Sequence, residues 1–104
     1  MRFRKLTVGE GRTVPQHMVD QTLSELGFGW LLDCEVEDAD VQVVNKTIVW
    51  RSGNLYTGSW HYGIWKSGDF HGRWENGIFE SGRMLGQFVS GVIPDALLDQ
   101  KNKR

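Results

Sequence analysis

Histidine, cysteine and acidic side chains are the residues of this chain that could bind a metal ion or act as a nucleophile. The three histidines are His17, His61 and His71, and the last two lie at different positions of a repeated pattern, so we do not expect them to converge on a metal ion. The acidic segment 33–40 lacks the glycine and the spacing of a calcium loop. The single cysteine, Cys34, has no catalytic motif around it, and its alternating position predicts a buried thiol. We therefore expect no enzyme activity, no metal site and no cofactor.

Tryptophan and tyrosine offer a different chemistry, which is stacking against a sugar ring or a base. The chain holds five tryptophans and two tyrosines. If one face of the aromatic segment is open, the candidate binding residues are Tyr62, Trp65, Trp60 and Trp74. Packing of these rings in the core is the competing interpretation. No nucleic acid is expected, because residues 48–93 carry four basic against three acidic side chains, whereas a glycan or a lipid head group would fit.

The aromatic residues recur together with glycine at a fixed period of 14 residues. Tyr56, Phe70 and Met84 occupy equivalent positions in successive units. The units align without a gap over residues 56–93, and a half-unit at 48–53 precedes them with one residue inserted. Every glycine from Gly53 to Gly91 is followed two residues later by a large apolar residue. These closely spaced glycines exclude helices, because glycine costs about 1 kcal/mol per helix position relative to alanine. Short strands joined by tight turns are expected instead.

Two folds fit this repeat. In the first, each unit is a β-hairpin with a turn such as Asn76-Gly77, and the units form an antiparallel meander of short Gly/aromatic strands. In the second, each unit is one 14-residue coil of a three-sided β-solenoid. The solenoid would have sides of about 15 Å, at about 3.3 Å per residue, which leaves too little room for three inward indoles per layer, so we favour the meander. The solenoid would stack Trp50/Trp65/Phe79/Ile93, Leu55/Phe70/Met84 and Trp60/Trp74/Phe88.

Part of the repeat is similar to a known family. Residues 56–63, Tyr-Thr-Gly-Ser-Trp-His-Tyr-Gly, and residues 70–77, Phe-His-Gly-Arg-Trp-Glu-Asn-Gly, resemble the Tyr-x-Gly-x-Trp-x-x-Gly core of MORN repeats. The resemblance covers less than half of the chain, and it implies antiparallel hairpin arrays that serve as scaffolds, dimerisation modules or lipid-binding surfaces. The unit is shorter than a MORN unit, and Met84 replaces an aromatic residue. The spacing also resembles the pentad-like Gly-x-Trp/Phe repeats of uncharacterised bacterial and phage proteins, which implies no activity.

The N-terminal half predicts a strand, a helix and a second strand. Residues 2–8 are typical of a short strand. A helix follows, which Thr13 is placed to cap and which Gly27 is placed to end. The apolar segment 28–32 is expected to be buried. Residues 33–44 alternate between apolar and acidic side chains, which is typical of a half-exposed strand.

The meander would leave an aromatic face that one helix is too small to cover. Burial of apolar surface contributes about 25 cal/mol per Å2, so we expect another sheet face or another subunit to cover the rest, and we predict a homo-oligomer. We divide the chain into a covering segment, 1–47, the repeat, 48–93, and a C-terminal cap and basic tail, 94–104, which fold as one unit. Leu97 and Leu98 are expected to pack on the last strand.

Length and charge limit the class of protein. A chain of 104 residues with a net charge of −1 is one small domain without a general attraction to nucleic acid or an acidic membrane. No signal peptide and no transmembrane segment are expected, which favours a cytoplasmic or virion-associated protein. We predict a mainly β, non-enzymatic structural or assembly protein whose Gly/aromatic repeat surface mediates self-association or docking in a larger protein assembly. The alternative is a ligand-binding module for a glycan or lipid head group, which would act through exposed aromatic residues.

Overall fold

The computed structural model describes residues 2–94, which form mainly strands together with short helical segments. β1 (Phe3–Val8) confirms the strand predicted at the start of the chain. β2 (Arg12–Thr13) runs back beside β1 as its antiparallel neighbour. Gly9, at φ 69°, lies in the turn between these two strands. The mainly β class expected from the sequence is therefore what the described residues show.

The helical segment starts later than predicted. A 3-10 turn, η1 (Gln16–Met18), leads into α1 (Val19–Glu25). The predicted helix cap at Thr13 is wrong, because Thr13 pairs with β1 as part of a strand. Pro15, immediately before η1, is also extended, at ψ 144°. Gly27 follows the end of α1 as predicted, with φ 92°, a left-handed conformation that glycine adopts without strain.

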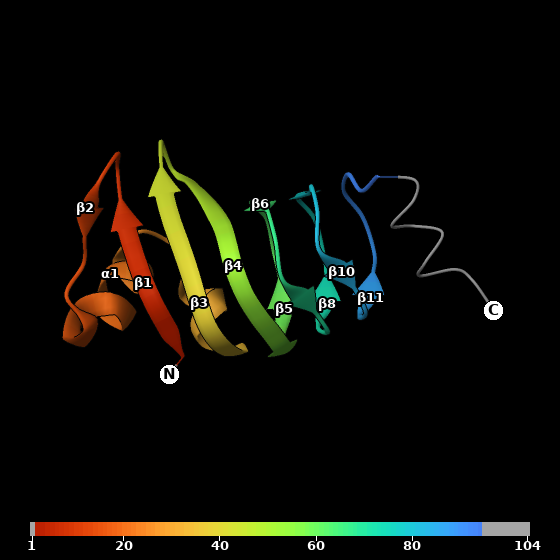
Figure 1. The fold of residues 1–104 in the computed structure, drawn as a ribbon, viewed down its shortest axis with the longest axis horizontal. Coiled ribbons are helices and arrows are strands. Elements are labelled where there is room, and N and C mark those ends of the chain that lie inside the picture. The colour runs from red at the N-terminus through yellow and green to blue at the C-terminus, as the bar shows by residue number, and fades with distance from the viewer. Residues whose placement is uncertain (1, 95–104) are drawn as a thin grey trace.

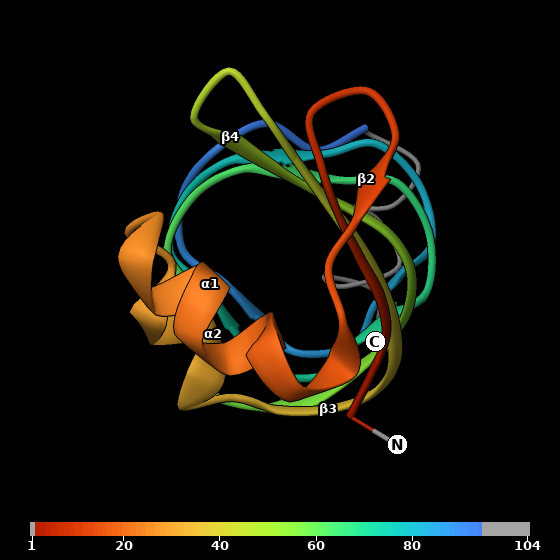
Figure 2. The same ribbon diagram turned by 90° about the vertical axis from the view of Figure 1, so that its left-hand side faces the viewer.

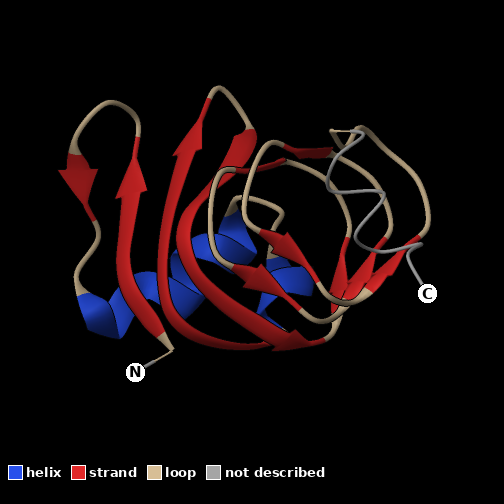
Figure 3. Ribbon diagram, turned by 45° about the vertical axis from the view of Figure 1, so that its right-hand side comes forward, coloured by secondary structure: helices blue, strands red, loops and turns tan. Residues whose placement is uncertain are grey.

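A single helical turn, α2 (Gly29–Leu32), follows α1. The apolar segment around α2 was expected to be buried, and Phe28 and Leu31 are, while its other large side chains are half-buried. Val19 and Leu23 of α1 are buried in the same cluster as the inward side chains of β1. Figure 3 shows both helices against one face of the sheet that contains β1.

The two longest strands form an antiparallel pair. They are β3 (Glu35–Val44) and β4 (Thr47–Thr57), and Asn45 and Lys46 turn the chain between them with positive φ angles of 51° and 64°. β3 also pairs in parallel with β1, so the sheet runs in the order β2-β1-β3-β4 (Figure 1). Exposed acidic residues and buried valines along β3 confirm the half-exposed strand predicted over 33–44.

Beyond β4 the chain winds into a coil of two-residue strands. Each strand pairs in parallel with the strand one repeat further along the chain, for example Ser59 with Arg73 and Ile64 with Ile78. In Figure 2, which looks along the coil, successive turns of the chain lie one behind another around a common centre. β4 supplies the first turn, because it pairs with strands on two sides of the coil. The short strands are β5 (Ser59–Trp60), β6 (Ile64–Trp65), β7 (Asp69–Phe70), β8 (Arg73–Trp74), β9 (Ile78–Phe79), β10 (Arg83–Met84) and β11 (Gln87–Phe88).

The antiparallel meander that we favoured from the sequence is wrong. The strand pairs of the coil are parallel, and Asn76-Gly77 connects β8 to β9 at a corner instead of closing a hairpin. The pairing follows the alternative, in which Trp65 lies between Trp50 of the turn before and Phe79 of the turn after. The hairpin arrays implied by the resemblance to MORN repeats are likewise not the arrangement of this segment.

Three large side chains fit inside one turn of the coil, and they are two indoles and one phenyl ring, not the three indoles of our estimate from the perimeter. Trp65, Phe70 and Trp74 meet edge to face, with interplanar angles of 85°, 83° and 85°. Between turns the rings lie parallel: the centroids of Trp50 and Trp65 are 4.5 Å apart at 8°, and those of Trp60 and Trp74 are 5.3 Å apart at 7°. Edge-to-face contacts within a turn and stacking between turns are the two favourable arrangements of aromatic rings. The perimeter estimate misled us because it considered three indoles per turn, whereas each described turn contains at most two.

Glycine lets successive turns approach this closely. A side chain at Gly72 would collide with the carbonyl oxygen of Gly58 in the turn before, and one at Gly77 would collide with that of Gly63. Gly77 also has φ 120°, a backbone conformation that other residues rarely adopt. The corner glycines therefore permit both the sharp change of direction and the close spacing of the turns.

One hydrophobic core extends from Phe3 in β1 to Met84 in β10. α2 packs beside β5, so the helical segment and the coil share this core. The inward aromatic rings from Trp50 to Phe79 are buried and Phe88 is half-buried, so residues 2–94 contain no open aromatic face of the kind that the meander would leave. That face was our reason to expect a homo-oligomer, so the reason no longer holds. The predicted cap by Leu97 and Leu98 lies outside the described residues.

Candidate functional site

The four aromatic residues that we expected to bind a ligand lie in two different environments. Trp60, Trp65 and Trp74 are each 0% exposed and form the stacked interior of the coil. Neither face of these indoles is accessible to a ligand in this structure. Tyr62 alone reaches the surface, with 41% of the residue exposed. The structure therefore does not bring the four residues together as one surface.

Tyr62 joins the coil to the helical segment. Its hydroxyl donates a hydrogen bond to the carbonyl oxygen of Gly27 over 3.4 Å, and its ring lies 5.6 Å from the rings of both Phe28 and Trp30. His61 stacks on Trp30 with an interplanar angle of 2°. The indole Nε1 of Trp30 is buried and has no hydrogen-bond partner among the described residues. This corner is mainly a packing contact between α2 and the coil.

Cys34 is buried, as its alternating position predicted. Burial away from water raises the pKa of its thiol to about 11. The sulfur lies 3.5 Å from the carbonyl oxygen of Trp30 and 3.6 Å from that of Ser59, both of which can accept a hydrogen bond from the thiol. A thiol in this environment stays protonated at neutral pH and is a poor nucleophile. Within residues 2–94, no three histidine, cysteine or acidic side chains are close enough together to hold a metal ion.

The outer surface of the coil has a feature that we did not predict. Each two-residue strand places its second side chain inward and its first outward. On the side that begins in β4 and continues through β6 and β9, the outward residues lie next to each other in register, and all of them are branched aliphatic residues. We call this row the aliphatic face. It consists of Val49, Ile64, Ile78 and Val92.

Exposure of the aliphatic face increases along the coil. Val49 and Ile64 are half-buried, Ile78 is 42% exposed and Val92 is 62% exposed. Isolated exposed aliphatic residues are common on protein surfaces, but four in adjacent register form a continuous apolar strip. A strip of this kind is a candidate contact surface.

The outward positions on the other two sides of the coil are polar. On one side they are Asp69 and Arg83, and Asn54 of β4 continues the row. On the third side they are Ser59, Arg73 and Gln87. Exposed apolar residues also occur at two corners, Leu85 and Val89, but the aliphatic face is the side whose outward strand positions are apolar in every turn.

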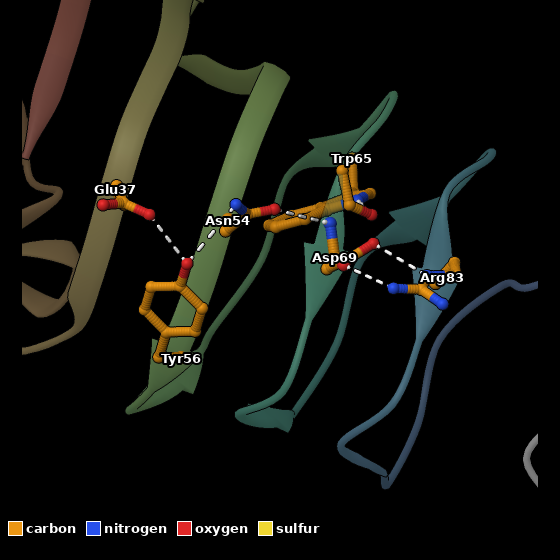
Figure 4. Close-up of polar contacts among 7 residues, drawn as sticks. Glu37, Asn54, Tyr56, Trp65, Asp69 and Arg83 are labelled. Carbon is orange, nitrogen blue, oxygen red and sulfur yellow. Dashed lines mark hydrogen bonds and ion pairs between the residues drawn. The ribbon is translucent and has the colours of Figure 1, made fainter.

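Figure 4 shows the polar side in detail. Arg83 donates two hydrogen bonds to the carboxylate of Asp69, at 3.0 and 2.8 Å, and these bonds lower the pKa of Asp69. The backbone N–H of Asp69 in turn donates to the side-chain oxygen of Asn54. The hydroxyl of Tyr56 donates to Glu37 over 2.8 Å, which raises the pKa of Tyr56. These side chains use their hydrogen-bonding groups on one another and connect adjacent strands.

Charged residues border the aliphatic face. Lys66 follows Ile64 by two residues and Glu80 follows Ile78 by two residues, so both lie at the same corner in adjacent turns. Their Nζ and Oε1 atoms are 3.2 Å apart, and the side chains are 50% and 43% exposed. Arg51 follows Val49 by two residues and lies at the same corner, so the face has positive charges beside the rows of Val49 and Ile64 and a negative charge beside the row of Ile78.

The sequence contained a signal for the aliphatic face that we did not use. The segments Gly-Ile-Trp at 63–65, Gly-Ile-Phe at 77–79 and Gly-Val-Ile at 91–93 repeat an aliphatic residue before each inward residue at the same phase of the period. Our prediction of binding residues considered only the aromatic residues, most of which occupy inward positions. Assigning the outward positions requires knowing that residues one period apart are neighbours.

Comparison with known proteins found no match to this chain among family models, curated proteins or solved structures. The likeness to MORN repeats therefore stays a resemblance of short motifs. No helix in the described part of the chain is both long and apolar enough to cross a membrane.

Proposed function

We propose that this protein is a non-enzymatic assembly module that associates through the aliphatic face of a three-sided β-solenoid. The observation that carries the proposal is the in-register row of Val49, Ile64, Ile78 and Val92, set against polar outward residues on the other two sides. Covering exposed aliphatic side chains is favourable by about 25 cal/mol per Å2 of apolar surface removed from water. The row thus gives association a physical driving force.

The interior of the coil supports a structural role. Parallel stacking between turns and edge-to-face packing within them fix the position of each strand relative to the next. Close packing makes such an interior resist deformation. The outward residues are consequently held at regular spacing, which suits a surface that must match another surface.

Substitution of Ile78 tests this proposal. We expect Ile78→Lys to abolish concentration-dependent self-association, because a lysine in the middle of the row would have to be desolvated in the contact. The readout is solution mass by light scattering or sedimentation over a concentration series. Leu85→Lys is the matched control, since Leu85 is similarly exposed, at 47%, and lies at a corner away from the aliphatic face. A wild-type protein that stays monomeric throughout, or equal behaviour of the two variants, would refute the proposal.

The alternative function, a ligand-binding module for a glycan or lipid head group, has less support. It requires exposed aromatic rings, and only Tyr62 of the four candidate residues is exposed. The ring of Tyr62 is moreover engaged with Phe28 and Trp30. A cytoplasmic or virion-associated location remains a proposal from the sequence.

A further inference from the structure

We propose that the aliphatic face binds a second copy of this chain, with the two coils antiparallel. The two-fold axis would run along the strand direction, between the row of Ile64 and the row of Ile78. This inference rests on the proposed function, and it adds the identity of the partner and the orientation of the contact.

The order of residues along the aliphatic face is palindromic. It reads valine, isoleucine, isoleucine, valine from Val49 to Val92. A two-fold axis at its centre would place Ile64 against Ile78 of the second copy and Val49 against Val92 of the second copy. An interface between identical copies requires this kind of self-complementary pattern, in which each contact occurs twice.

The bordering charges match the same arrangement. A rotation about an axis along the strands keeps each residue at its corner and exchanges the rows. Lys66 would then face Glu80 of the second copy, and Glu80 would face Lys66 of the second copy. Because these residues also pair within the chain, at 3.2 Å, four alternating charges would meet at the centre of one edge of the contact, and Arg51 of each copy would lie outside them, opposite the row of Val92. Complementary charges at the rim of an interface favour one orientation over others.

The other two-fold arrangement lacks this match. An axis along the coil would keep the rows and exchange the corners, so that Lys66 would face the corner before Ile64, where Tyr62 lies. Glu80 would face the corresponding corner at Asn76. Neither Tyr62 nor Asn76 carries a charge that complements the residue opposite, so the observed charges favour the antiparallel copy.

The expected contact is small. Four rows at a spacing of about 4.8 Å span about 14 Å, so the four side chains cover a smaller area than the about 800 Å2 per partner that stable interfaces bury. We therefore expect a weak dimer that exchanges rapidly with the monomer. The experiment needs protein concentrations that approach the millimolar range.

Charge reversal at the two corner residues tests the orientation. We expect Lys66→Glu alone and Glu80→Lys alone each to self-associate about tenfold more weakly than wild type, because like charges would face each other twice. An equimolar mixture of the two variants should recover association. In the mixed dimer the introduced glutamate would face the introduced lysine in one contact, and the native Glu80 and Lys66 would face each other in the second. The measurement is sedimentation velocity of each variant and of the mixture, with circular dichroism to verify that both fold.

The matched control uses the ion pair on the polar side of the coil, which also joins adjacent turns. Arg83 and Asp69 are 2.8 Å apart, and both side chains are partly exposed. Arg83→Glu and Asp69→Lys should each self-associate like wild type, and mixing them should add nothing. If mixing these controls strengthens association as much as mixing the corner variants, general charge attraction explains the result and the proposed orientation is wrong.

The outcomes separate the two proposals. If Ile78→Lys abolishes association but the mixture of corner variants stays as weak as each variant alone, the aliphatic face is the contact and the antiparallel arrangement is wrong. If wild type does not self-associate at all, both proposals fail. Recovery in the corner mixture, without recovery in the control mixture, supports the antiparallel dimer.

Discussion

Gly72 shows how little space separates successive turns of the coil. Its φ is ordinary, so the reason for glycine at this position is packing and not backbone conformation. An added Cβ would collide with the carbonyl oxygen of Gly58 and would lie 2.9 Å from a methyl carbon of Leu55. The carbonyl belongs to the backbone of the turn before, so it cannot move without disturbing the hydrogen bonds between the strands of the two turns.

We expect Gly72→Ala to lower the free energy of unfolding by about 1–3 kcal/mol, the usual cost of forcing extra atoms into a packed interior. Chemical denaturation measures this change. Gly29→Ala is the matched control, because a Cβ at Gly29 meets nothing within 4 Å and alanine favours the helix there. The account of the close approach is wrong if both variants are as stable as wild type.

At the scale of the element, the short strands of the coil depend on one another. A two-residue strand has too few contacts to be stable alone, and each one here is fixed by the strands of the neighbouring turns. The ion pair between Asp69 of β7 and Arg83 of β10 spans one such step on the polar side. It reports directly on whether neighbouring turns are in the observed register.

Removal of Arg83 tests this register through the pKa of Asp69. Hydrogen bonds from Arg83 lower that pKa in the folded protein, so the ion pair contributes stability above the unfolded pKa, and this contribution is lost as the pH falls through the folded pKa. We expect Arg83→Gln to raise the pKa of Asp69 toward its ordinary value, as measured by NMR titration of the carboxylate. An unchanged pKa would mean that these two residues are not neighbours in solution.

Elements of the N-terminal half were predictable to different degrees. The strand at 2–8, the half-exposed strand at 33–44 and the end of the helix at Gly27 follow from local patterns that tertiary contacts did not override. The start of the helix does not follow from such a pattern, because Thr13 is a residue type that commonly caps helices but here it pairs with β1. Strand pairing is a non-local interaction, which a local capping motif does not reveal.

Local sequence patterns also could not predict the parallel strand pairing in the coil. The period of the repeat and the three inward stacks could be read from the sequence, but hairpins and coils share that period. The deciding factor is how Trp50, Trp65 and Phe79 stack across turns, which depends on ring orientation and not on composition. The aliphatic face was missed for the same reason, since its four residues become neighbours only in the coil.

At the scale of the whole molecule, the described chain is elongated, with principal extents of 43 × 24 × 18 Å. The sheet of the N-terminal half and the coil follow each other along the long direction (Figure 1). In the row that continues the aliphatic face into this sheet, Val49 is followed by Gln42 of β3, which is polar and half-buried, and then by Thr7 of β1, which is buried. The row of exposed aliphatic residues thus does not continue into this sheet, which confines the proposed contact to the coil.

The most direct test of this account is an NMR comparison of backbone amide shifts at low and high protein concentration. Association through the aliphatic face predicts concentration-dependent shifts centred on Val49, Ile64, Ile78 and Val92, with Asn54 and the opposite polar side unchanged. The measurement locates the contact without any substitution. Shifts centred on the polar side, or no shifts up to millimolar concentration, would contradict the central claim.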